Sequence, residues 1–233
     1  TALCAIWACA NVSAQLERFN ERETRLFAER GDPEAQFELG RHLITGTEVA
    51  KKDEKAGAGW LRKAADQNHL PAQHVMGSLY EEGIGVSKDL AKAVEWYRKA
   101  ANNGLAMAQH SLGIMYDFGK GVTKDPKEAA QWFRNAANQD FPPSQAAYAS
   151  KLERGDGLDK STNKAALWYL RAAQADYVPA MTKLANMYYT GTGVPLDYRR
   201  TSAWYRRATR AGDPWATNDL AWFLATCPDE SFH

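Results

Sequence analysis

The sequence predicts an all-α solenoid built from tandem two-helix repeats, and three observations support that fold class. Tryptophan recurs every 36 residues, at Trp60, Trp96, Trp132, Trp168 and Trp204. Small residues keep the same period, at Gly77, Gly113, Ala149, Ala185 and Ala221. No stretch alternates apolar and polar residues long enough to favour a β-strand. A fixed period of this length is typical of repeat arrays, in which each repeat packs on its neighbours.

The composition is that of an ordinary folded chain. Hydrophobic residues make up 45% of the 233 residues, which excludes bulk disorder. The formal net charge of +1 gives no overall indication of a nucleic-acid partner or an anionic membrane. A disulfide framework is not expected, because only Cys227 lies outside the N-terminal segment that holds Cys4 and Cys9.

Residues 1–14 carry no charge and are expected to be the remnant of a secretory signal peptide. Val12 and Ala14 stand three residues and one residue before the expected cleavage point. A buried first helix is the alternative. Export predicts a periplasmic or secreted protein, and residues 15–32 are then expected to form an N-terminal capping helix. No membrane-inserting segment is expected in the mature chain, because about 20 apolar residues are needed to span a bilayer.

The first helix of each repeat, here called helix A, is predicted over about residues 72–82 in the second repeat. Met76 and Tyr80 lie four residues apart and therefore on one helical face. Gly77 allows a neighbouring backbone to come close. A Gly-x-Gly-Val turn follows, and its first glycine, Gly83, is expected to be a left-handed C-cap.

The second helix, helix B, follows this turn. N-caps are expected at Asp89, Asp125 and Asp197. In the third repeat, a proline at N1 and Glu128 at N3 indicate a capping box. In the second repeat, helical spacing relates Ala93, Trp96, Tyr97 and Ala100.

Together, the Leu-Gly-x-x-Tyr, Gly-x-Gly-Val and Ala-x-x-Trp-Tyr-x-x-Ala-Ala motifs resemble the Sel1-like repeat, a relative of the tetratricopeptide repeat. The resemblance implies a right-handed α/α superhelix with helix A on its concave side, and adaptor or scaffold work, often in the bacterial envelope. The array is expected over residues 33–228, as 33–70, 71–106, 107–142, 143–178, 179–214 and a half repeat, 215–228. Residues 229–233 are expected to be a truncated tail.

The repeats depart from the pattern in places. Glu48 replaces the second glycine of the first turn, and Asp159 falls two positions early in the fourth repeat. Solenoid ends normally need a polar cap. The last helix instead carries Leu220, Phe223 and Leu224, which are expected to face nothing. We therefore expect the gene to continue, or this end to pack on a partner, with end-to-end self-association as one option.

No cofactor, metal site or catalytic set is expected. The Gly-x-Gly turns follow helices, whereas phosphate loops follow strands, so a structural role is favoured over nucleotide binding. His74 and His110 hold equivalent positions, but a row of polar surface groups is favoured over a His/carboxylate metal site. Some cysteine-rich relatives are described as penicillin-binding or β-lactamase-like, and this chain lacks their cysteine pairs.

The tetratricopeptide analogy indicates groove-facing positions on helix A, a series that also contains Thr182. The candidate partner-binding residues are Phe37, Arg41, His74, Ser78, Glu81, His110, Ile114, Asp117, Glu153, Asn186, Tyr189 and Trp222. These positions vary in chemistry from repeat to repeat, as expected of a surface that meets a partner. Drift of positions that are merely exposed explains this variation equally well. The acidic row that includes Glu81 and Asp117 suggests a polar or basic peptide. Protonation of the two histidines near pH 6 is expected to weaken its binding.

A basic run on the last helix B contains Arg199, Arg200, Arg206, Arg207 and Arg210. A solvated face is the favoured interpretation, and a contact for an acidic partner or lipid headgroups is the other. Three functions follow from the sequence. The first is a non-catalytic envelope scaffold that binds a protein or peptide and no nucleic acid. The second is an immunity protein that neutralises a secreted toxin, and the third is a cell-wall-acting or β-lactamase-like enzyme.

Overall fold

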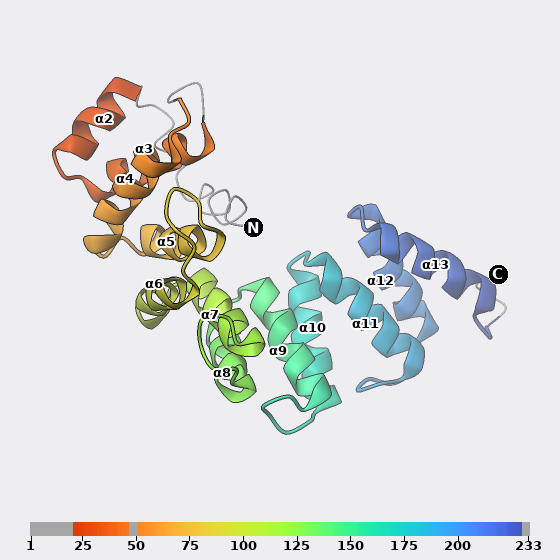
Figure 1. The fold of residues 1–233 in the computed structure, drawn as a ribbon. Coiled ribbons are helices and arrows are strands. Elements are labelled where there is room, and N and C mark those ends of the chain that lie inside the picture. Colours follow the sequence, from red (N-terminus) through yellow and green to blue (C-terminus); the bar gives the residue numbers. More distant parts are fainter. Residues whose placement is uncertain (1–20, 47–50, 230–233) are drawn as a thin grey trace. The chain divides into compact units, whose positions relative to one another are not determined.

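The computed structural model describes residues 21–46 and 51–229, and over these ranges the chain is helical with no strand (Figure 1). The described helices fall into two compact units, divided between Lys124 and Asp125. The first unit holds α2 (Glu21–Glu29), α3 (Pro33–Thr45), α4 (Glu54–Asp66), α5 (Leu70–Glu82), α6 (Leu90–Asn102) and α7 (Ala106–Phe118). The second holds α8 (Pro126–Ala137), α9 (Pro142–Arg154), α10 (Thr162–Gln174), α11 (Val178–Thr190), α12 (Tyr198–Arg210) and α13 (Pro214–Thr226).

Each unit alternates the two helix types and packs consecutive helices against one another. Odd-numbered helices from α3 onward are helix A, and even-numbered helices from α4 onward are helix B. One alanine position of helix B is fully buried in every repeat, at Ala64, Ala100, Ala136, Ala172 and Ala208. A side chain this small lets paired helices approach closely, which explains the alanine-rich composition of helix B.

The predicted helix caps are confirmed. Asp89 accepts a hydrogen bond from the Lys92 backbone N–H at 3.0 Å, and Asp125 and Asp197 cap α8 and α12 in the same way. Gly83 ends α5 in the left-handed conformation, with φ of 79°. Helix α5 begins at Leu70 rather than near Ala72, because the His69 ring caps it. Helix α10 has no side-chain cap hydrogen bond, since Ser161 and not Asp159 is its N-cap residue.

The second glycine of each Gly-x-Gly turn packs on the preceding repeat. A Cβ built on Gly85 would lie 2.1 Å from the carbonyl oxygen of Glu54, at the start of α4. In the second unit, a Cβ on Gly157 would lie 2.4 Å from the carbonyl carbon of Pro126. Both glycines also have positive φ, of 66° and 77°. The turn therefore requires glycine for an inter-repeat contact and has no need of a ligand to explain it.

The tryptophan row carries cations from its own helices. The Lys63 ammonium lies 3.7 Å from the Trp60 ring centroid, and Lys99 lies 4.0 Å from that of Trp96. The second unit repeats the arrangement with the guanidinium of Arg171 over Trp168 and of Arg207 over Trp204. In each of these i, i+3 pairs the cation covers one face of the indole.

The expectation that Phe223 faces nothing is wrong, because this side chain is fully buried. It packs with Ala185, Tyr205 and Cys227, and Leu220 and Leu224 lie partly buried against the same cluster. The rings of Tyr189, Tyr198 and Tyr205 surround that of Phe223, with centroids 5.9, 6.3 and 6.1 Å away.

Several predictions fall on residues that lie outside the described ranges. These are the signal remnant, most of the residues before α2, Glu48 and residues 230–233. Helix α2, within the predicted capping segment 15–32, packs on α3, and its Ala28 carbonyl accepts a hydrogen bond from Gln36 Nε2 at 3.1 Å. Among the described helices, none combines the length and apolar character that a membrane span requires.

Candidate functional site

In the first unit, the predicted groove positions are largely closed. Phe37, His74 and Ser78 are buried, with exposed fractions of 1%, 4% and 5%. The Phe37 ring lies 4.8 Å from the His69 ring, and His74 Nε2 lies 3.1 Å from Ser111 Oγ on the next helix A. Ser78 Oγ lies 3.0 Å from the Tyr97 hydroxyl. The expectation that these three residues form an open surface is therefore wrong, because their side chains pack on neighbouring helices.

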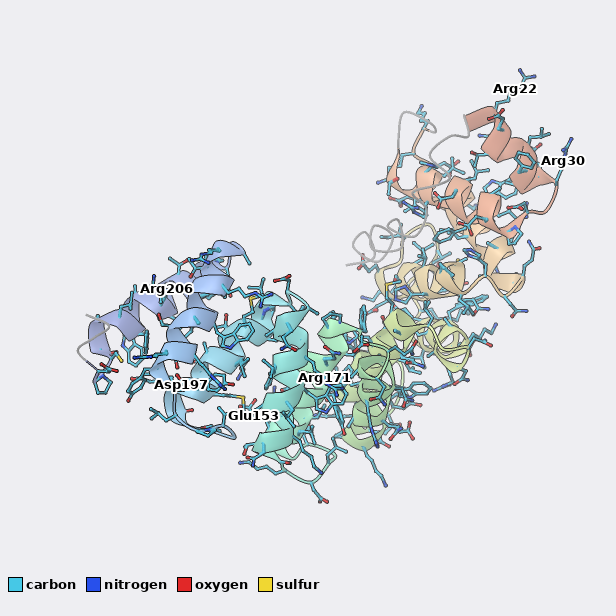
Figure 2. The ribbon with its side chains drawn as sticks, turned by 180° about the vertical axis from the view of Figure 1, so that it is seen from behind. Arg22, Arg30, Glu153, Arg171, Asp197 and Arg206 are labelled. Carbon is cyan, nitrogen blue, oxygen red and sulfur yellow. The ribbon has the colours of Figure 1, made fainter. Side chains whose placement is uncertain are left out.

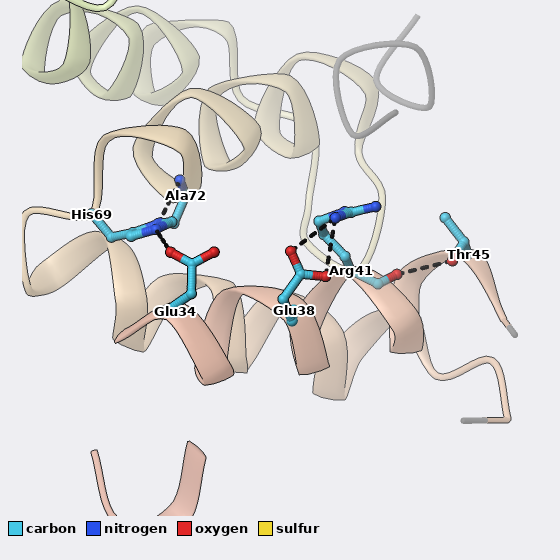
Figure 3. Close-up of polar contacts among 6 residues, drawn as sticks. All are labelled: Glu34, Glu38, Arg41, Thr45, His69 and Ala72. Carbon is cyan, nitrogen blue, oxygen red and sulfur yellow. Dashed lines mark hydrogen bonds and ion pairs between the residues drawn. The ribbon is translucent and has the colours of Figure 1, made fainter. Parts of the chain in front are cut away.

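His69 organises one edge of this surface, and the sequence analysis missed it. Its Nδ1 accepts a hydrogen bond from the Ala72 N–H, and its Nε2 donates to Glu34 of the preceding helix A at 2.9 Å (Figure 3). A histidine directly before Leu70 and Pro71 was the available signal, since Pro71 falls in the first helical turn.

Arg41 is also engaged within its own helix. Its Nη1 donates to both carboxylate oxygens of Glu38, at 2.9 and 3.0 Å, and both side chains are 15% exposed (Figure 3). The guanidinium also lies 5.7 Å from the Phe37 ring centroid. Arg41 therefore offers little charge to an incoming group.

Two acidic residues of the predicted row accept hydrogen bonds from internal donors. Glu81 accepts a hydrogen bond from the Tyr97 hydroxyl at 3.0 Å and forms an ion pair with Lys120 at 3.0 Å. In the second unit, Glu153 accepts from the Tyr169 hydroxyl at 3.0 Å. Both glutamate side chains keep 26% exposure. Three further candidates, His110, Ile114 and Asp117, are partly buried on α7.

Burial controls the titration of this surface. Desolvation lowers the pKa of His74 from 6.5 to about 4, with the neighbouring His110 lowering it further and Glu81 opposing. Desolvation also lowers the pKa of His110 to about 4. The expectation that both histidines become charged near pH 6 is therefore wrong, because neither imidazolium is hydrated well enough. Burial raises the pKa of Tyr97, which keeps its hydroxyl a donor to Glu81.

On α11 and α13 of the second unit, the helix A surface is more open. A groove of about 560 Å³ lies between the first turns of α11 and the turn from α12 into α13. Thr182 and Asn186, both groove positions in the sequence analysis, line it together with Lys183 and Trp215. Thr182 Oγ1 donates to Asp213 at 3.1 Å, which fixes one wall. The Tyr205 hydroxyl donates to Asn186 Oδ1 at 2.6 Å, which orients that amide.

Helix α13 carries two exposed indoles, one of which, Trp215, lines this groove. Trp215 is 78% exposed and Trp222 is 54% exposed. Trp222 packs edge-to-face on Tyr189 of α11, with ring centroids 5.6 Å apart. Trp222 and Tyr189 were sequence candidates, whereas Trp215 was missed because it lies outside the three groove-facing series. Tryptophan is among the residues most enriched where protein interfaces concentrate their binding energy.

The described residues offer no group of three or more His, Cys, Asp or Glu side chains that could hold a metal ion. What the open surface provides is an indole, an ammonium at Lys183 and an oriented amide. Such groups bind another chain by apolar contact and hydrogen bonds.

Comparison with known proteins agrees with this architecture. The sequence model of the Sel1 repeat matches residues 33–69, 70–105, 106–141, 142–177 and 178–213. No curated protein matches the chain.

Solved structures extend the comparison. The chain is similar to c5321, a protective antigen of uropathogenic Escherichia coli with the SLR fold, at 37% identity and a TM-score of 0.85 over 89% of this chain and 44% of that one. A Sel1 repeat protein from Oxalobacter formigenes is 28% identical, with a TM-score of 0.80 over 87% of this chain and 59% of that one. The chain thus spans less than two thirds of both. The immunity protein Pa5087 from Pseudomonas aeruginosa shares the fold at 18% identity and a TM-score of 0.55, over 89% of this chain and 81% of that one.

Proposed function

Because the chain belongs to the Sel1 repeat family, whose members typically act as non-catalytic scaffolds for protein–protein interactions, we propose that it binds a protein or peptide partner through the helix A surface of its second unit. The predicted all-α solenoid of Sel1-like repeats is confirmed by the family match and by the solved relatives. The predicted partner-binding surface included helix A positions along the whole array, whereas the surface proposed here is only the groove between α11 and α13.

The groove beside Trp215 is the observation that carries this proposal. Binding energy at protein interfaces concentrates in a few large side chains, with tryptophan among the most enriched. Trp215 provides a mostly exposed indole at the groove, and Lys183 and Asn186 provide polar groups that can orient a bound segment. A groove of about 560 Å³ accommodates a few side chains of an extended or helical segment.

Site-specific photo-crosslinking tests this proposal. A benzophenone amino acid at Asn186 should capture a partner from the native envelope, and the adduct should disappear when Trp215→Ala is added. The same probe at Gln131, an exposed position on helix B of the same unit, is the matched control. Equal capture from both positions, or capture that ignores Trp215→Ala, would contradict the assignment of the groove.

The envelope location is part of the proposal and is supported by the uncharged apolar segment at residues 1–14. Fractionation of cells that express the natural gene should recover the protein in the periplasm or the medium. Recovery in the cytoplasm alone would contradict export.

An immunity role is the second candidate, because the same fold occurs in an immunity protein of Pseudomonas aeruginosa. In that case a strain lacking the gene should be killed by a protein that its siblings secrete, and the gene should restore survival. A scaffold role predicts no such killing.

The enzyme alternative predicts turnover of nitrocefin or of peptidoglycan, and the proposed binding function predicts none. End-to-end self-association through α13 stays a prediction, which sedimentation at rising protein concentration tests.

A further inference from the structure

Helix α12 carries five arginines and no acidic residue. Four of them are exposed, and three of these four, Arg199, Arg206 and Arg210, are spaced by seven and four residues. At 100° per residue these spacings place the three side chains within about 20° of one line along the helix. The line extends over about 16 Å, because each residue adds 1.5 Å. We call these three residues the α12 arginine stripe.

The other two arginines of α12 have carboxylate partners. Arg207 forms an ion pair with Asp176 at 2.8 Å, and Arg200 lies 3.4 Å from Asp197, the cap residue. The stripe residues have no ion pair within the part of the chain that the structure describes. Arg206 instead donates from Nε to Ser202 of its own helix at 3.2 Å. Asp197 and Arg206 are both labelled in Figure 2. The three uncompensated guanidinium groups are therefore the three on one line.

In the first unit, the arginines equivalent to Arg206 donate hydrogen bonds to neighbouring helices. Arg62 Nη1 donates to the hydroxyl of Tyr80, and Arg98 Nη2 donates to that of Tyr116, each on the following helix A. The residue of α13 that corresponds to these tyrosines is Leu224, which has no hydroxyl. Arg206 has thus lost the acceptor that its equivalents use.

The equivalent lines of positions on α4 and α6 each include an acidic residue, and α12 has none. The position equivalent to Arg210 is Asp66 on α4, which lies 4.0 Å from Arg62. On α6 the same line contains Glu95. On α12 the corresponding residues are Arg210 and Ala203. Helix α4 has cations at the first two stripe positions, Lys55 and Arg62, so α12 differs from it by carrying a third cation, Arg210, in place of an acid.

We propose that the α12 arginine stripe is a second docking surface, separate from the groove, for an acidic helical segment of a protein partner. Ala203 lies between Arg199 and Arg206 and is exposed, so a partner helix can approach closely along the line. The spacing of four, three and four residues through Ala203 is the spacing of one helical face. A partner helix with carboxylates at the same spacing meets all three guanidinium forks, which match carboxylates in shape.

The test uses an alanine-rich helical probe peptide of about 18 residues with glutamates along one face, and a glutamine version of it. Fluorescence anisotropy at about 50 mM salt measures affinity for the whole chain, and repetition at about 150 mM should weaken it. The triple variant Arg199→Gln, Arg206→Gln, Arg210→Gln should bind the glutamate peptide about tenfold more weakly, since tenfold corresponds to 1.4 kcal/mol shared by three pairs.

A matched control removes the same charge elsewhere. The variant Lys55→Gln, Arg62→Gln, Lys63→Gln changes three exposed cations of α4, two of which are equivalent to Arg199 and Arg206, and it should keep affinity within about twofold. Circular dichroism confirms that both variants fold. An equal loss in the control would overturn the proposal, because overall charge would then explain binding. It would also be overturned if the glutamine peptide bound as well as the glutamate peptide, or if the chain bound only vesicles containing about 30% phosphatidylglycerol and neither peptide.

Discussion

The two units place similar positions of helix A in opposite environments. In the first unit, His74 is 4% exposed and contacts Ser111 on the next helix A. Its equivalent in the second unit is Thr182, which is partly exposed and lines a groove of about 560 Å³. Both side chains contact the next repeat, because Asp213 is the N-cap residue of α13, so the two positions differ in how much of the side chain is covered and not in its reach.

The comparison shows that one repeat framework can be closed or open according to a few side chains. The buried alanines and the turn glycines recur in both units, and each unit has aspartate caps on helix B. The groove-facing residues are Phe37 and His74 in one unit and Thr182 and Asn186 in the other. Variation at these positions therefore decides where a repeat array can receive a partner.

The largest effect that tests this comparison is expected from Phe37→Ala. Phe37 is 1% exposed and packs on the His69 ring, so its loss leaves a cavity and should lower the free energy of unfolding by about 3–5 kcal/mol. Urea unfolding measures the change. Trp222→Ala on the open surface is the control and should cost about 1 kcal/mol or less, because that indole is 54% exposed. Similar costs for the two variants would remove the distinction between closed and open surfaces.

The next effect tests the packing of the second turn glycine, which both units share. Gly157→Ala should lower the free energy of unfolding by about 3 kcal/mol, because a left-handed alanine and an overpacked contact with Pro126 both contribute. Gly212→Ala is the control, since that glycine has φ of 86° but open space around its Cβ position, and it should cost only about 1 kcal/mol.

Gly85→Ala extends this comparison to the first unit, where the corresponding contact is with Glu54. If urea midpoints show a large loss for Gly157→Ala and none for Gly85→Ala, the shared turn packing would be contradicted.

The framework could be predicted from the sequence because its chemistry repeats. The residue types of Gly83 and Asp89 recur at the same helix ends in several repeats, so each repeat supports the helix boundaries assigned in the one before it. The candidate site was predicted less well. Sequence spacing identified the face on which Phe37 and His74 lie but not their burial, since exposure depends on the side chain that the next repeat presents.

Trp215 could not be assigned from the period either. Its equivalents are Pro71, Met107, Pro143 and Pro179, residues of the first helical turn with no shared groove-facing pattern. What distinguishes it is its neighbours, because it lines the groove together with Thr182 and Asn186. Local sequence contains no signal for such a coincidence of neighbours.

Acid should destabilise the closed surface. The folded-state pKa of His74 is about 4, below its ordinary value of 6.5, so the unfolded chain binds more protons between these values. Stability is therefore full above about pH 6.5 and falls as the pH drops towards 4. His74→Gln should remove about 2 kcal/mol of the fall between pH 6.5 and 4.5, since each pH unit corresponds to about 1.4 kcal/mol per group.

Urea unfolding at several pH values measures this fall for the wild type and for the His74→Gln variant. His110→Gln should remove a comparable share, because burial lowers the pKa of His110 in the same way. An unchanged pH dependence after both substitutions would contradict the assignment of the fall to these two histidines.

The smallest effect concerns the one tryptophan of the row without a cation over its ring in the described chain. Lys99 covers Trp96 in the first unit, whereas Asn135 follows Trp132 at the same spacing in the second and accepts a hydrogen bond from Gln131 at 3.2 Å. Asn135→Lys should raise the free energy of unfolding by about 0.5 kcal/mol, because an ammonium over an exposed indole face contributes about that much. Asn135→Met supplies a similar apolar stem without charge. If thermal unfolding shows the same gain for Met and Lys, the cations of the other repeats stabilise their tryptophans by packing and not by charge.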